Sequence, residues 1–138
     1  MPDLAAELAR LHAAAFVMPR PWSKAEIADL LAGPLCFLVQ EPVGFLIGRV
    51  VAGEAELLTV AVWPAAQGRG IGGRLVQGFL AEARAREAVM AFLEVAETNH
   101  AARAVYAQAG FDQTGRRRGY YHTATGAAVD ALVLAQKL

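Results

Sequence analysis

A glycine-rich loop between a predicted strand and a predicted helix is the feature that most restricts the fold of this chain. Residues 54–62 form a strand-like run, and residues 71–88 show apolar side chains at every fourth position, as in an amphipathic helix. The connecting segment, residues 63–73, contains four glycines. A helix that begins in such a loop presents backbone N–H groups to an anion, and glycine lets a phosphate approach closely. The segment therefore predicts an α/β protein with a phosphate site at a strand–helix junction.

Two common phosphate-binding loops do not fit this segment. No Gly-Lys-Ser/Thr sequence follows it, so it is not a Walker loop. Its glycine spacing differs from that of the dinucleotide-binding fingerprint, and the strand before it is not the first of the chain. A turn that joins strand to helix and binds nothing remains the alternative.

The rest of the sequence alternates between strand and helix patterns. Helices are predicted over residues 3–16, 24–32, 71–88 and 100–109. Strands are predicted over residues 36–40, 45–51, 54–62, 89–95, 111–115 and 128–135. Ser23 and Glu26 form a capping box for the second helix, and Asn99 is a good N-cap for the fourth. Short connections between the first three strands predict an antiparallel meander, so we expect one α/β domain over residues 1–138, with a mixed central sheet flanked by helices.

Composition excludes several classes of protein. The chain has 138 residues, 56% of them hydrophobic, and 13 basic side chains balance 13 acidic ones. It has no apolar run of the roughly 20 residues that a membrane span needs, and no signal-peptide pattern at its start, so we expect a cytoplasmic protein. One cysteine and three scattered histidines do not form a metal site. We interpret the run Arg116-Arg117-Arg118 as a solvated turn, and there is no basic stripe typical of a nucleic-acid-binding protein.

The glycine loop resembles a known signature. Gln67-Gly68-Arg69-Gly70-Ile71-Gly72 matches the Gln/Arg-x-x-Gly-x-Gly/Ala pattern of the GNAT N-acetyltransferase superfamily. Pro21-Trp22-Ser23, Leu93-Glu94-Val95 and Arg117-Arg118-Gly119-Tyr120-Tyr121 are similar to segments of the RimI-type ribosomal-protein-alanine N-acetyltransferases, in that order and at about that spacing. That family begins with a strand before its first helix, whereas this chain starts almost at the helix. Either that strand is missing, which would leave a sheet edge exposed, or the start of the chain is misassigned.

The resemblance implies that acetyl-CoA is the cosubstrate. In the family, the glycine loop holds the pyrophosphate, the preceding strand binds pantetheine through its backbone, and an asparagine contacts the cosubstrate. The matching residues here are Val60, Ala61, Val62, Gln67, Gly68, Arg69, Gly70, Ile71, Gly72, Gly73 and Asn99. The alternatives are an ordinary core strand for residues 60–62 and a plain N-cap for Asn99. In each case the structural role and the binding role could coexist.

The resemblance also implies two catalytic residues. Glu94 would be the general base that removes a proton from the attacking amine, and Tyr106 the general acid that protonates the leaving thiolate. A glutamate that faces outward from an edge strand and a tyrosine of the core are the alternatives. Glu97 is a rival base, although its sequence context indicates a loop.

The acceptor side is implied by the same family. The loop Met18–Trp22 and the segment Arg116–Thr125 would flank a peptide groove, with Trp22, Tyr120 and Tyr121 as its aromatic contacts. The implied acceptor is the N-terminal α-amino group of a protein, such as a ribosomal protein. A small-molecule amine acetyltransferase and a catalytically silent acyl-CoA sensor are the alternatives on the same fold.

Overall fold

The computed structural model describes residues 3–16 and 21–138, which contain four α-helices, six strands and a short 3-10 turn. The helices are α1 (Leu4–Ala15), α2 (Lys24–Ala32), α3 (Ile71–Ala85) and α4 (His100–Gln108). The strands are β1 (Cys36–Glu41), β2 (Gly44–Val51), β3 (Glu54–Val62), β4 (Met90–Ala96), β5 (Asp112–His122) and β6 (Ala128–Lys137). The 3-10 turn is Pro64–Ala66. This order confirms the predicted alternation of strands and helices.

The strands form one mixed sheet in the order β1-β2-β3-β4-β6-β5. The predicted meander is confirmed, because β1–β2 and β2–β3 pair in antiparallel fashion, as do β4–β6 and β5–β6. The β3–β4 pair is parallel. Within the described part of the chain α1 is the first element, and β1 and β5 are the edge strands of the sheet.

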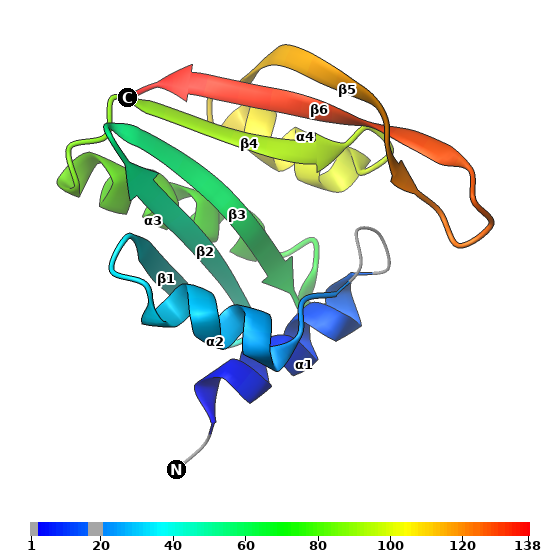
Figure 1. Ribbon diagram of the computed structural model, residues 1–138, viewed down its shortest axis with the longest axis horizontal. Coiled ribbons are helices and arrows are strands. Elements are labelled where there is room, and N and C mark those ends of the chain that lie inside the picture. The colour runs from blue at the N-terminus through cyan, green and yellow to red at the C-terminus, as the bar shows by residue number, and fades with distance from the viewer. Residues whose placement is uncertain (1–2, 17–20) are drawn as a thin grey trace.

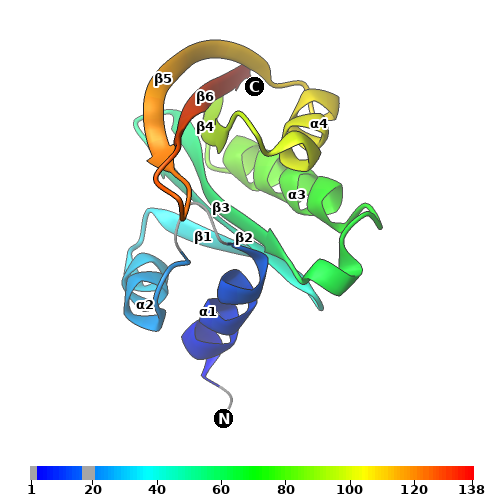
Figure 2. The ribbon, with the colours of Figure 1, turned by 90° about the vertical axis from the view of Figure 1, so that its right-hand side faces the viewer.

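Helices cover both faces of the sheet, with α1 and α2 on one face and α3 and α4 on the other (Figure 2). Because side chains alternate along a strand, β2 supplies both cores. Leu46 lies in the core under α3, together with Phe37 and Phe79, whereas Phe45 and Ile47 lie in the core under α1 and α2. The glycine at position 48 allows the two Phe rings to approach the sheet, since a Cβ there would lie 2.6 Å from Phe37.

The β3 and β4 strands separate after a short paired segment (Figure 1). They pair from Glu54–Met90 to Glu56–Phe92, but β3 continues to Val62 and β4 to Ala96. Beyond the paired segment, one edge of β3 therefore faces an opening instead of a neighbouring strand. This separation creates the cleft described below.

Local hydrogen bonds account for the start of α2 and for the end of α3. Ser23 accepts a hydrogen bond from the Glu26 N–H, and Glu26 accepts one from the Ser23 N–H, which confirms the capping box. The helix α3 ends at Ala85, before the predicted residue 88. There Glu87 adopts φ +64°, and the Ala88 N–H donates to the Ala83 carbonyl, as in a Schellman motif. Glycine is the residue usually found at this position. Because a glutamate stands there instead, the sequence carries no signal for the end of the helix.

The fifth strand was predicted too short, and the three arginines were wrongly interpreted as a turn. Residues 112–122 form one strand that pairs with β6, and it includes Arg116, Arg117 and Arg118. A polar run has no strand periodicity. Its extended conformation is instead stabilised by pairing with β6 and by acidic partners for the first two arginines.

A buried histidine connects α1 to the sheet and to the start of α2. His12 is 1% exposed, and its Nδ1 accepts a hydrogen bond from the Trp22 N–H at 3.0 Å. Its Nε2 lies 2.8 Å from the Thr59 hydroxyl. Because Nδ1 is an acceptor, the proton of the neutral ring is on Nε2, which donates to Thr59. The ring also stacks on Phe16 and Trp22, at 4.2 Å and 5.3 Å between centroids.

The folded protein should lose stability in mild acid because of His12. Burial lowers the pKa of His12 from 6.5 to about 4, with a smaller opposite effect of Glu26. Between these values the unfolded chain binds a proton that the folded chain does not. The stabilisation is therefore complete above pH 6.5 and is lost as the pH falls toward 4, by at most about 3 kcal/mol.

Urea unfolding at a series of pH values measures this effect. The variant His12→Gln should be less stable at neutral pH and should lose most of the slope between pH 6.5 and 4. His100→Gln is the matched control, because it makes the same substitution at an exposed histidine. A wild-type slope in His12→Gln would contradict the assignment.

Candidate active site

A cleft of about 330 Å³ opens where β3 and β4 separate. Its wall consists of the end of β3, the loop that follows it, the first turns of α3, the helix α4 and the end of α1. These elements bring together segments that are far apart in the sequence. The cleft therefore combines a free strand edge with the N-termini of two helices.

Most of the cosubstrate residues predicted from the family resemblance line this cleft. They are Val60, Ala61, Val62, Gln67, Gly68, Gly70, Ile71, Gly72, Gly73 and Asn99. Tyr106 lines it too, whereas Arg69, which is exposed, and Glu94 lie outside the lining. Sequence reasoning missed Ala15 and Phe16 from α1, because contact between the end of a helix and a distant loop leaves no local signal.

The glycine loop leaves open space in front of α3. Gly68 and Gly70 adopt φ +80° and +79°, which favours glycine, and an added Cβ at Gly68 or Gly73 would have no heavy atom within 4 Å. The first helical hydrogen bond runs from the Arg74 N–H to the Gly70 carbonyl, so the N–H groups of residues 71–73 have no partner within the helix. Together with the positive end of the helix dipole, they form a cradle suited to a phosphate or pyrophosphate.

Gln67 and Asn99 each make a hydrogen bond that fixes one wall of the cleft. The Gln67 side chain donates from Nε2 to the Val62 carbonyl at 3.1 Å, which ties the loop to the end of β3. Asn99 accepts a hydrogen bond from the Ala102 N–H at 3.2 Å and so caps α4, as predicted. Asn99 also lines the cleft. The N-cap role of Asn99 is therefore compatible with a ligand contact.

Glu94 lies on β4, beyond the segment that pairs with β3. At this position β4 pairs with β6 through Val133, whereas its pairing with β3 ends at Phe92, so one edge of the strand is free beside Glu94. The Glu94 side chain is 26% exposed, and its Oε1 lies 2.9 Å from Nε of Arg117 on β5. The Arg117 guanidinium also lies 5.3 Å from the centre of the Tyr120 ring. A carboxylate is thus held at the surface of the sheet by a cation that stacks on an aromatic side chain.

Glu97, the rival base, is engaged elsewhere. Its Oε2 accepts a hydrogen bond from Nη1 of Arg116 at 2.8 Å. The same guanidinium nitrogen donates to Asp130 at 2.6 Å. Of the two glutamates, Glu94 is therefore the one whose partner also contacts an aromatic residue of the predicted acceptor side.

Tyr106 is buried in the wall of the cleft. Its ring is 5% exposed and packs edge-to-face on Phe111, with 6.1 Å between centroids. Burial, followed by the neighbouring Tyr121, raises the pKa of Tyr106 well above its ordinary value. The pKa of Tyr121 is raised as well, first by burial and then by the charge of Glu94. Both hydroxyls are therefore protonated at neutral pH, and Tyr121 lies within electrostatic range of both predicted catalytic residues.

The predicted acceptor side is only partly described. Tyr120 is 51% exposed and Tyr121 half-buried, and their rings meet edge-to-face at 5.1 Å. Trp22 is half-buried against His12. The predicted loop residues Met18, Pro19 and Arg20 lie outside the described residues.

Residues 3–16 and 21–138 contain neither of two further kinds of feature, a metal-binding cluster and a membrane-spanning helix. No group of three or more His, Cys, Asp or Glu side chains is placed to hold a metal ion there. No helix in the same ranges is long and apolar enough to span a membrane.

Comparison with known proteins identifies relatives over most of the chain. The ribosomal protein bS18-alanine N-acetyltransferase of Salmonella typhimurium is 42% identical over 91 residues, which cover 66% of this chain and 61% of that protein, less than two thirds of its length. The N-alpha-acetyltransferase RimI of Mycobacterium tuberculosis is 39% identical over 122 residues, covering 82% of this chain and 75% of that protein.

Solved structures and a family model agree with this. The crystal structure of the ribosomal-protein-S18-alanine N-acetyltransferase from Escherichia coli superposes with a TM-score of 0.84 at 31% identity, covering 98% of this chain and 86% of that one. The model of the acetyltransferase (GNAT) family matches residues 5–111. The fold, the cleft and these matches together show that the chain belongs to the GNAT acetyltransferase family.

Proposed function

We propose that this protein is an acetyl-CoA-dependent N-acetyltransferase that acts on the N-terminal α-amino group of a protein in the cytoplasm. The observation that carries the proposal is the cleft. The start of α3, with N–H groups that have no partner in the helix, the free edge of β3 and the buried Tyr106 all line it. The acceptor class is supported by relatives whose names specify the alanine of ribosomal protein bS18.

The residues of the cleft fit acetyl-CoA. The glycines of the loop leave space that any side chain would fill, and the N–H groups of residues 71–73 suit the pyrophosphate. The edge of β3 at residues 60–62 has backbone groups that could bind the pantetheine amides and a thioester carbonyl. Bound there, acetyl-CoA would supply an acetyl group activated as a thioester.

Glu94 and Tyr106 divide the proton chemistry between them. The acceptor amine is protonated at neutral pH and must lose a proton to attack the carbonyl carbon, and Glu94 accepts that proton. As the carbon–sulfur bond breaks, Tyr106 donates a hydrogen bond to the departing sulfur. Its raised pKa keeps the hydroxyl protonated but makes complete proton transfer to a thiolate unfavourable, since an ordinary thiol has a pKa of about 8.5. Tyr106 therefore acts chiefly by stabilising the negative charge.

Release of free thiol from acetyl-CoA tests the proposed function. The wild-type protein should turn over peptides with a free N-terminal alanine and should leave their N-acetylated counterparts unchanged. Turnover of simple polyamines alone would replace the protein acceptor by a small molecule. Binding of acetyl-CoA without any turnover would indicate an acyl-CoA sensor.

The variant Gly72→Val should weaken acetyl-CoA binding. The Cβ would lie 4.0 Å from Val105, so the backbone accommodates it, but the branched side chain would enter the phosphate cradle. We expect the Kd to rise at least about tenfold, a loss of about 1.4 kcal/mol. Calorimetric titration measures it, with Gln77→Val on the exposed part of α3 as the matched control. An unchanged Kd in a folded Gly72→Val protein would exclude this loop as the site.

The variant Glu94→Gln should lower turnover while binding acetyl-CoA normally. It keeps the size of the side chain and removes the proton acceptor, so kcat should fall by about 10²–10⁴-fold at neutral pH. The loss should shrink at high pH, where more of the amine is neutral. Glu82→Gln on α3, which removes a surface ion pair, is the matched control. A rate near that of the wild type would assign the role of base to another group.

The variant Tyr106→Phe separates a packing role from a catalytic one. Phenylalanine preserves the edge contact with Phe111, so loss of the hydroxyl should cost at most about 0.5–1.5 kcal/mol of stability. If the hydroxyl stabilises the departing sulfur, single-turnover acetyl transfer should slow by about 10²-fold. More than half the wild-type rate, with chemistry rate-limiting, would leave Tyr106 with packing alone.

A further inference from the structure

A bulge in β5 lies next to the proposed acceptor residues. Arg117 pairs with Ala131 and Tyr121 pairs with Val129, so residues 118–120 oppose Asp130 alone. At its centre, Gly119 adopts φ +60°. A bulge of this kind bends the strand and changes the direction of the side chains that flank it. Here those side chains include Arg117, which pairs with Glu94, and the two tyrosines of the acceptor side.

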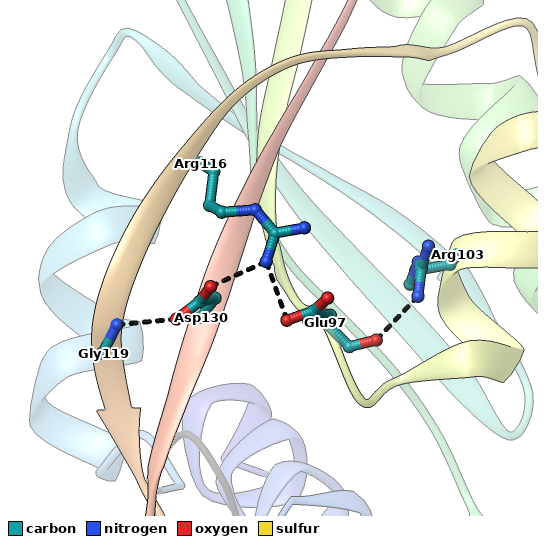
Figure 3. A network of polar contacts seen from close by, with 5 residues as sticks. All are labelled: Glu97, Arg103, Arg116, Gly119 and Asp130. Carbon is teal, nitrogen blue, oxygen red and sulfur yellow. Dashed lines mark hydrogen bonds and ion pairs between the residues drawn. The ribbon is translucent and has the colours of Figure 1, made fainter.

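The Asp130 carboxylate lies between Gly119 and Arg116 and contacts both (Figure 3). Its Oδ1 accepts a hydrogen bond from the Gly119 N–H at 2.8 Å, and its Oδ2 accepts one from Nη1 of Arg116 at 2.6 Å. The Gly119 hydrogen bond, followed by the Arg116 guanidinium, lowers the pKa of Asp130, so the carboxylate stays charged at neutral pH. A single acidic side chain of β6 therefore binds both the centre of the bulge and the arginine that precedes it.

The same arginine connects the bulge to the loop between β4 and α4. Nη1 of Arg116 also donates to Oε2 of Glu97 at 2.8 Å. The Glu97 backbone is held on both sides, since its N–H donates to the Asp130 carbonyl at 2.9 Å and its carbonyl accepts from Nη1 of Arg103 on α4 at 2.8 Å. The polar contacts in Figure 3 thus join β5, β6, the end of β4 and α4.

The exposure of these groups argues against a role in stability. The side chains of Arg116, Glu97 and Asp130 are 34%, 42% and 24% exposed. Ion pairs at such positions contribute little to the free energy of unfolding, because water screens them. Their geometry is nevertheless specific. One nitrogen of Arg116 makes both charged contacts. Together with the backbone contacts of Glu97, these contacts connect β5, β4 and α4, the elements that carry the proposed catalytic and acceptor residues near the bulge.

We propose that Arg116, Glu97 and Asp130 are positioning residues that hold the β5 bulge in place relative to Glu94. They fix Arg117, Tyr120 and Tyr121. Without them, these side chains would move with β5, an edge strand that pairs with β6 alone. The inference rests on the proposed function, since the group positioned is the acceptor amine against Glu94. None of the three residues needs to touch the acceptor or acetyl-CoA.

Three variants of Arg116 and Asp130 test this arrangement. Arg116→Met removes both charged contacts and leaves two carboxylates facing each other. Arg116→Lys should restore much of the function, because a single nitrogen makes both contacts in the wild type. Asp130→Asn keeps an acceptor for the Gly119 N–H but loses the charge that binds Arg116. Glu82→Gln, which breaks the ion pair with Arg86 on α3, is the matched control.

The readouts are steady-state kinetics, acetyl-CoA titration and hydrogen exchange of the Gly119 amide. For Arg116→Met we expect kcat/KM for an alanine-initial peptide to fall about 10–100-fold, mainly through KM, since misplacement of a binding group is costly. The Kd of acetyl-CoA should stay unchanged, exchange at Gly119 should accelerate, and the melting temperature should stay close to that of the wild type. Arg116→Lys and Asp130→Asn should fall between Arg116→Met and the wild type.

Two results would overturn the inference separately from the proposed function. If the wild type acetylates peptides and Arg116→Met does so with the same KM, the network does not position the acceptor. If Arg116→Met lowers the melting temperature and weakens acetyl-CoA and peptide binding alike, the role is structural. A wild type that acetylates no peptide contradicts the proposed function itself, and the positioning role falls with it.

Discussion

The separation of β3 from β4 is the constraint on which the rest of the structure depends. A sheet whose strands paired along their whole length would satisfy its backbone internally and leave nothing to bind a ligand. Here the parallel pair ends at Glu56 and Phe92, and both strands continue. The cost is a row of backbone groups without strand partners. In the proposed function, acetyl-CoA supplies those partners, so the same opening would account for the position of the cleft and for the binding of an amide-containing ligand.

Two cores pack against opposite faces of the sheet. The core under α3 packs against β1, β2 and β3, and its apolar side chains continue onto β4 and β6 through Leu93 and Leu132. The core under α1 and α2 contacts the opposite face, where Phe45, Ile47 and Ala61 lie. Because Ala61 packs into that core while its neighbours Val60 and Val62 face the cleft side, β3 can bind a ligand with its backbone without losing its place in the fold.

Local signals predicted most of the fold, and tertiary contacts account for what they missed. The capping box of α2 and both ends of β3 follow from residues a few positions apart. The early end of α3 was missed because Glu87 replaces the usual glycine, and the length of β5 because pairing with β6 is not visible in a polar run. In the candidate site, the glycine loop is local and was predictable. The contribution of Phe16 to the cleft and the partners of Glu94 and Glu97 come from distant segments, which one sequence cannot bring together.

The pairing of Glu94 with Arg117 bears on how an amine could be made reactive. A carboxylate alone would stabilise the ammonium form of the acceptor and so oppose the loss of its proton. Arg117, 2.9 Å from Glu94, brings a positive charge to the same place and disfavours a second cation there. In the proposed mechanism, the neutral, nucleophilic form of the amine would therefore be favoured more beside the Glu94–Arg117 pair than beside a carboxylate alone, and Glu94 would still accept the proton. The bulge that sets the position of Arg117 would in this way influence the reaction from outside the cleft.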